Sequence, residues 1–197
     1  ERIEPGSQSG LALGMRAIRD GHGFRNDGSE QFGDYLVAGW LWQPQQRERH
    51  RQLMRDCDYV YPCGQDVSVE QIEATRELLE WAHERDIQVV GFLPSYAPSL
   101  WDEMQNNPEH AYIQPTRDAL SALFAEFSFP FFDYSNGEWL GLADEDFFDG
   151  WHASEKGNLA LFIQLVRYVP ELAEYTDLNT LTDIFASSQD TWQVFVP

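Results

Sequence analysis

Amphipathic helical segments alternate with short apolar runs along this 197-residue chain, and this order limits the folds that the chain can adopt. Residues 69–85 predict a helix capped by Ser68, and the run "IQVVGFLP" (87–94) after them predicts a buried strand that ends at a proline. Residues 112–127 and the aromatic-rich run "FPFFDYS" (129–135) repeat this order of helix and strand. A helical crossover between two strands favours a parallel pair, so the sequence predicts the α/β class.

Further helical patterns flank these elements. Ser154 is a good cap for a helix over residues 155–168, because apolar side chains then recur at one-turn spacing from Leu159 to Val166. The tripeptide "NDG" (26–28) predicts a turn. The other predicted helices cover residues 10–20, 43–55, 98–106 and 178–186.

The charge of the chain excludes several classes of partner. It has 33 acidic against 13 basic side chains, a net charge of -20, and Lys156 is its only lysine. Such a surface repels the phosphates of DNA and RNA and anionic lipid, so we expect no nucleic-acid partner. The 5 histidines stand singly, without the H-x-x-x-H or H-E-x-x-H pairs of metal sites. We therefore expect no metal and no cofactor.

Two cysteines, Cys57 and Cys63, flank a short segment in "DCDYVYPCG". A disulfide across this segment is geometrically feasible and would indicate an oxidising compartment. Two free thiols are the alternative, and the residues alone do not decide between them. The spacing is not the C-x₂-C of a zinc site.

The candidate chemistry lies in "DFFDGWHASEKGN" (146–158), between the second predicted strand and the last long helix. Functional groups of open α/β sheets gather beyond the carboxyl ends of the strands. One turn of chain can bring the Asp149 carboxylate to Nδ1 of His152, which leaves Nε2 to act as a general base. On spacing alone, a structural interpretation is favoured, in which Asp149 caps a turn and His152 begins a helix.

The block around this pair resembles the final block of the SGNH (GDSL-like) hydrolase and acyltransferase superfamily, where D-x-x-H lies just ahead of the last helix. Here it reads Asp149-Gly150-Trp151-His152, followed by Ser154 and Gly157. The resemblance implies a three-layer, flavodoxin-like parallel sheet, with Asp149 orienting His152 and His152 acting as the base. It extends over about residues 23–168, where the order of segments is similar to that of DltD-like and alginate-acetylation-like cell-envelope members: "GFRNDGS" (23–29), "IQVVGFLPSYAPSLWDEM" (87–104) and "FPFFDYSN" (129–136).

The chain departs from that superfamily at the nucleophile, a serine on a G-D-S-like or G-x-S-like segment after the first strand. The segment "GSQSG" (6–10) has Gln8 at its centre and no strand before it. Ser95 follows the 87–94 strand but lacks the neighbouring glycines of a nucleophile turn, and a pocket-lining role with Tyr96 and Trp151 is the alternative. We therefore expect a nucleophile from an amino-terminal segment or a partner, and a chain that is inactive alone.

Two functions are consistent with these features. The first is part of a serine esterase or O-acyltransferase that acts on an acylated small molecule or glycan, which the resemblance places in the periplasm, the cell envelope or outside the cell. The second is a noncatalytic binding or assembly module of the same architecture. In both we expect residues 1–173 to form the carboxyl-terminal part of an SGNH-like α/β domain, incomplete at its amino-terminal side, and residues 174–197 to form an extension.

Overall fold

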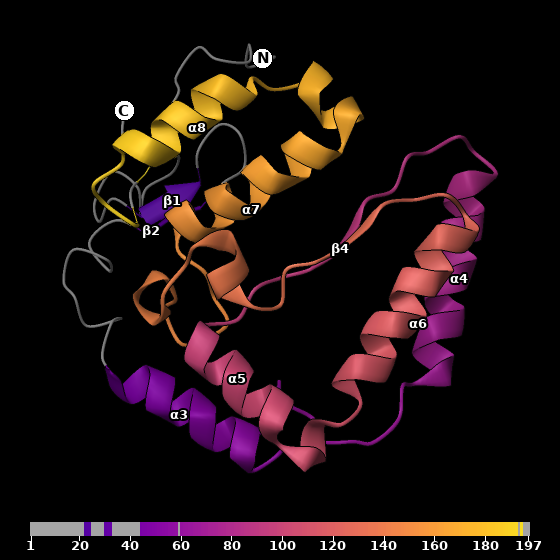
Figure 1. Ribbon diagram of the computed structural model, residues 1–197, viewed down its shortest axis with the longest axis horizontal. Coiled ribbons are helices and arrows are strands. Elements are labelled where there is room, and N and C mark those ends of the chain that lie inside the picture. The colour runs from indigo at the N-terminus through magenta and orange to yellow at the C-terminus, as the bar shows by residue number, and fades with distance from the viewer. Residues whose placement is uncertain (1–21, 25–29, 33–43, 59, 193, 195–197) are drawn as a thin grey trace.

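The computed structural model describes residues 22–24, 30–32, 44–58, 60–192 and 194 (Figure 1). These residues form a mixed α/β fold, as the sequence predicts. The strands are β1 (His22–Phe24), β2 (Glu30–Phe32), β3 (Gly91–Leu93) and β4 (Phe131–Asp133). The α-helices are α3 (Pro44–Arg55), α4 (Val69–His83), α5 (Pro98–Asn106), α6 (Ile113–Glu126), α7 (Glu155–Tyr168) and α8 (Leu178–Ser187).

Strands β3 and β4 confirm the predicted parallel pair. Their register sets Gly91 opposite Phe131 and Leu93 opposite Asp133, and α5 and α6 form the crossover between them. Both strands are shorter than the predicted runs 87–94 and 129–135. In each strand only three residues pair with the other strand. The three-layer sheet that the resemblance implies needs more strands than these two. Strands β1 and β2 form a separate antiparallel pair that the sequence did not predict.

Helices α4 and α6 lie side by side, at the right of Figure 1, and α6 contacts β4 of the parallel pair. Leu79 of α4 and Leu123 of α6 are buried in one apolar cluster, and Phe131 of β4 packs against it. Gly91 allows this close approach, since a Cβ there would lie 2.4 Å from the Phe124 ring. Ser68 caps α4 as predicted, its hydroxyl accepting a hydrogen bond from the Gln71 amide at 3.3 Å.

A second apolar cluster joins α3, α5 and α7. It contains Met54 of α3, Leu100 of α5 and Leu161 of α7, together with Phe147 from the loop before α7. Burial of such side chains is worth about 1.5–3 kcal/mol each, so this cluster fixes the three helices relative to that loop.

Helix α8 packs against α7, with Leu181 and Phe185 against Leu159 and Ile163 (Figure 1). Lys156 adds polar links, its amide donating to Thr191 O at 3.0 Å and its ammonium to Ser188 O at 2.9 Å. The described part of residues 174–197 is therefore docked on the body of the protein.

The predicted helices 98–106 and 155–168 coincide with α5 and α7. Ser154 caps α7, its hydroxyl accepting from the Gly157 amide at 3.0 Å. The predicted helix 10–20 and the predicted turn 26–28 lie outside the described residues. None of the described helices has the length and apolar character that a membrane span requires.

Candidate functional site

A compact loop between the short 3₁₀ helix Asp144–Asp146 and α7 carries the predicted pair. The amide of Phe148 donates to the carbonyl of His152 at 2.8 Å, which closes the loop on itself. Gly150 at its tip has φ +111°, a conformation that other residues rarely adopt, and a Cβ there would lie 2.9 Å from Leu100 Cδ2. The turn that brings residues 149 and 152 together therefore depends on this glycine.

Asp149 and His152 are joined directly. Nδ1 of His152 lies 2.7 Å from Oδ2 of Asp149. The other carboxylate oxygen, Oδ1, accepts hydrogen bonds from the amides of Trp151 at 3.1 Å and His152 at 3.0 Å. The Asp149 side chain is 5% exposed and the His152 side chain 59% exposed, so a buried carboxylate holds an accessible imidazole.

The electrostatics of the pair follow from these contacts. Burial raises the pKa of Asp149, but the hydrogen bonds from the His152 ring and from the two backbone amides outweigh it, and the resulting pKa lies below the usual value. The hydrogen bond to Asp149 raises the pKa of His152. Since the carboxylate can only accept, Nδ1 of His152 carries a hydrogen, and neutral His152 then has its lone pair on Nε2.

A cavity of about 480 Å³ lies beside this pair. His152 and Asp149 form part of its wall, together with Trp151, whose ring centroid is 4.3 Å from that of His152. The facing wall belongs to α3, which contributes Gln46, Arg49 and His50. The accessible histidine therefore borders a space that can admit a small group.

His50 is a site residue that the sequence analysis missed. Its Nε2 lies 3.5 Å from Oδ2 of Asp149, the oxygen that also accepts from His152. Its Nδ1 lies 3.0 Å from the hydroxyl of Tyr61, which is 0% exposed. The only signal in the sequence is that His50 shares a face of α3 with the buried Met54.

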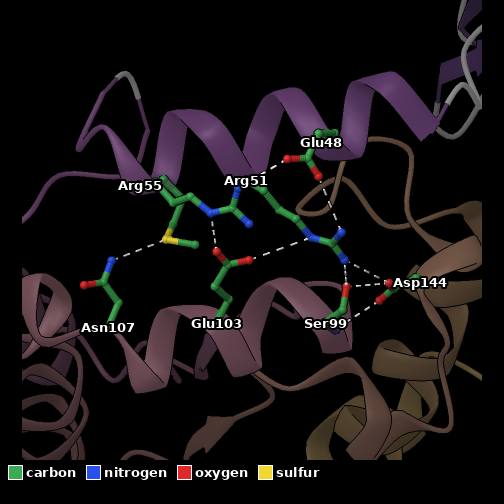
Figure 2. Close-up of polar contacts among 8 residues, drawn as sticks. Glu48, Arg51, Arg55, Ser99, Glu103, Asn107 and Asp144 are labelled. Carbon is green, nitrogen blue, oxygen red and sulfur yellow. Dashed lines mark hydrogen bonds and ion pairs between the residues drawn. The ribbon is translucent and has the colours of Figure 1, made fainter.

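Polar contacts hold α3, and hence His50, beside α5 (Figure 2). Glu103 of α5 forms ion pairs with Arg55 and, at 3.9 Å, with Arg51. Arg51 also lies 3.6 Å from Asp144, which accepts a hydrogen bond from the Ser99 amide at 3.0 Å. This network ties α3 to the start of α5 and to the segment that leads into the site loop.

Of the three residues predicted to line a substrate pocket, one borders the cavity beside the pair. Trp151 lines the cavity, whereas Ser95 and Tyr96 do not belong to its described lining. Ser95 is 4% exposed, and Tyr96 stacks on Trp101 with the ring centroids 5.9 Å apart.

Cys57 and Cys63 form a disulfide with their Cα atoms 5.1 Å apart. The loop that it closes carries Tyr61, the partner of His50, and Asp58, which lines the cavity. The two cysteines therefore close a loop that contributes to the site.

The described lining contains no serine, threonine or cysteine that could act as a nucleophile. Within the described ranges there is likewise no group of three or more histidine, cysteine or acidic side chains arranged to hold a metal ion. What this part of the chain presents is an oriented proton acceptor beside an open space.

No protein-family model matches the sequence, and no curated protein matches it.

Proposed function

We propose that Asp149 and His152 are the general-base pair of a serine esterase or O-acyltransferase of the SGNH type. The observation that carries the proposal is the 2.7 Å contact between Nδ1 of His152 and Oδ2 of Asp149, with the ring 59% exposed beside the cavity. This arrangement holds the imidazole in one tautomer and presents the other nitrogen outward, as proton transfer from a hydroxyl requires.

In the proposed reaction, Nε2 of His152 takes the proton of a serine hydroxyl as the serine oxygen bonds to the carbonyl carbon of an ester. The protonated ring then gives that proton to the departing alkoxide as its bond to the carbonyl carbon breaks. Water or an acceptor hydroxyl then attacks the carbonyl carbon of the acyl-serine, and His152 takes the proton of the attacking group. The ring gives that proton to the serine oxygen as the bond between the acyl group and the serine breaks. Asp149 stabilises the imidazolium in both steps, and base catalysis of this kind is worth about 10² to 10⁴ in rate.

In this proposal the serine comes from an amino-terminal segment or from a partner, and further strands complete a three-layer sheet. The edge of β3 supports this. Its Gly91 amide donates to Pro130 O at 2.9 Å and its Leu93 carbonyl accepts from Tyr134 at 3.1 Å, so both face β4. Phe92 lies between these two residues, so in a parallel strand its own amide and carbonyl point to the opposite edge of β3. No described strand pairs with that edge. Parallel sheets are normally covered on both faces, yet Phe92 is 42% exposed.

The proposed substrate is an acylated glycan or small molecule of the envelope, periplasm or extracellular space. Trp151 offers an aromatic surface beside the base, and Gln46 and Arg49 offer polar groups on the facing wall. The Cys57–Cys63 disulfide favours an oxidising compartment.

A noncatalytic binding or assembly module is the second candidate. The observation that favours it is the absence of a nucleophilic side chain from the described lining of the cavity. In that case His152 and Trp151 contact a ligand without a covalent step.

The experiment compares the chain, expressed with whatever sequence its gene encodes upstream, in wild-type and His152→Ala forms. We expect the wild type to hydrolyse an aryl acetate and to react with a serine-directed fluorophosphonate, and His152→Ala to lose both reactions. His83→Ala, at an exposed position on α4 away from the cavity lining, is the matched control and should retain both.

Two results would contradict the enzyme proposal. Undiminished turnover in His152→Ala would remove this histidine from the mechanism. A wild type that shows neither turnover nor labelling, but binds an acylated oligosaccharide, would establish the binding module instead.

A further inference from the structure

The carboxylate of Asp149 lies between two imidazole rings, only one of which the proposed mechanism uses. His152 and His50 approach the same oxygen, Oδ2, at 2.7 Å and 3.5 Å. They differ in accessibility, because the His50 side chain is 11% exposed and the His152 side chain 59% exposed. Both rings line the cavity, but the ring of His50 is largely buried beside the carboxylate and that of His152 is accessible.

The hydrogen on the His50 ring can be assigned from its neighbours. Burial lowers the pKa of His50, opposed in part by Asp149, so the ring is neutral and carries one hydrogen. Burial raises the pKa of Tyr61, so the phenol keeps its proton and can donate to Nδ1 of His50 at 3.0 Å. Nε2 of His50 then carries the hydrogen and directs it toward Asp149, which can only accept.

Nδ1 of His50 thus accepts a hydrogen bond from Tyr61, and Nε2 faces Asp149 at 3.5 Å, a contact longer than a hydrogen bond. A ring in this situation has no nitrogen left to exchange a proton with a substrate. It can instead restrict the carboxylate, whose other oxygen is already held by the amides of Trp151 and His152. Restriction matters because the direction of Oδ2 sets the orientation of the catalytic ring, and small misplacements of reacting groups are costly in rate.

We propose that His50 is a positioning residue for the Asp149–His152 pair, and that Tyr61 holds His50 in the tautomer this role requires. The assignment rests on the proposed function, because that function is what gives the Asp149–His152 pair a catalytic purpose. The arrangement of the two imidazole rings around one carboxylate can nevertheless be tested in the chain without any substrate.

The first test measures the tautomer of His152 by ¹⁵N NMR in the 197-residue chain. In the wild type, Asp149 should keep His152 in the Nδ1–H form. His50→Leu removes the inner donor and should shift His152 toward the Nε2–H form that free imidazole side chains favour. His50→Gln retains an N–H group that reaches Asp149 and should restore the wild-type tautomer. Gln52→Leu, on the same helix and hydrogen-bonded to Asp56, is the control that should change nothing.

The second test measures turnover in the active form of the protein. His50→Leu should lower kcat by about 10- to 100-fold with a smaller change in KM, because the two nitrogens of His50 lie beside Tyr61 and Asp149 and act on the orientation of the pair. His50→Gln should recover most of that loss. Where His50→Leu does not fold, Tyr61→Phe is the second variant, since it keeps both rings and removes only the donor to Nδ1.

The results separate this inference from the proposed function. A His152 tautomer that is the same in wild type, His50→Leu and Tyr61→Phe would overturn the positioning role, whatever the activity. A tautomer that shifts as expected, in a protein that has no esterase activity and no labelled serine, would support the positioning role while the proposed function fails.

Discussion

The amide of Ala97 donates a hydrogen bond to the carbonyl of Gly150 at 2.7 Å, which joins the segment after β3 to the loop that carries Asp149 and His152. A further bridge pairs Tyr96 with Asn136, beyond the end of β4. The loop of the candidate base is therefore attached to the segment after β3, which in turn pairs with the segment after β4. Both segments follow the carboxyl ends of the parallel strands, the edge at which α/β proteins gather functional groups. The two strands act as the support of the site.

Replacement of Gly150 by alanine should disturb the site loop selectively. The added Cβ would lie 2.9 Å from Leu100 Cδ2 at φ +111°, so we expect a loss of roughly 1–3 kcal/mol in unfolding free energy and a shifted His152 tautomer. Gly141→Ala is the matched control, because Gly141 has φ +74° with nothing within 4 Å of its added Cβ. It should cost about 1–2 kcal/mol through the backbone alone and leave the His152 tautomer unchanged. Denaturant unfolding and ¹⁵N NMR measure the two effects, and an unchanged tautomer in Gly150→Ala would contradict the prediction.

The titration of His152 should reveal its bond to Asp149. Because that hydrogen bond raises the pKa, the NMR midpoint of His152 should lie above the ordinary value of about 6.5. The stabilisation from protonated His152 is fully present below the unfolded-state pKa and is lost as the pH rises through the folded-state pKa. Asp149→Asn removes the charge and should lower the midpoint. Base catalysis needs the neutral ring, so turnover should increase with pH through the same midpoint. A midpoint that does not respond to Asp149→Asn would show that the two side chains are not coupled in solution.

Asp149 should make the protein sensitive to acid. Its pKa lies below the usual value, so its stabilising contribution is present above the unfolded-state pKa of about 3.9 and is lost as the pH falls through the folded-state pKa. Asp149→Ala, which removes the acceptor for two backbone amides and the His152 ring, should lower the unfolding free energy at neutral pH by about 1–3 kcal/mol. Thermal melts between neutral and acid pH compare the variant with the wild type. The difference between them should grow as His152 becomes protonated and then shrink as the pH falls through the folded-state pKa of Asp149, and a difference that is constant over the whole range would contradict the assignment.

The local elements of the fold could be predicted because their signals are local. Pro98 begins α5 and Ser154 caps α7, and the predicted bounds of both helices coincide with those observed. The parallel pairing of β3 and β4 followed from the helical crossover between them. The strand bounds could not be predicted equally well, because pairing with a neighbour, rather than apolar character, decides where a strand ends.

The Asp149–His152 contact was also accessible from the sequence, because only two residues of chain separate the partners. The approach of His50 was not, since it depends on how α3 packs against α5 and the loop before α7, through long-range contacts such as those of Met54 and Phe147. The same limitation applies to Tyr96, whose stacking on Trp101 also depends on the packing of α5. Secondary structure and short-range pairs were thus predictable, and the second wall of the site required the tertiary structure.

Reduction of the Cys57–Cys63 disulfide should affect both stability and the site. The bond closes a short loop, and the loss of its constraint on the unfolded chain should cost roughly 2 kcal/mol. The loop also carries Tyr61, so its release should weaken the contact of the phenol with His50 and shift the His152 tautomer in the same direction as Tyr61→Phe. A double variant, Cys57→Ser with Cys63→Ser, tests this without a reductant. Dithiothreitol should bring the wild type to the behaviour of the double variant and leave the double variant unchanged. If the double variant loses stability but keeps the wild-type tautomer, the disulfide supports the fold alone, and the proposed link from the loop through Tyr61 to the Asp149–His152 pair is wrong.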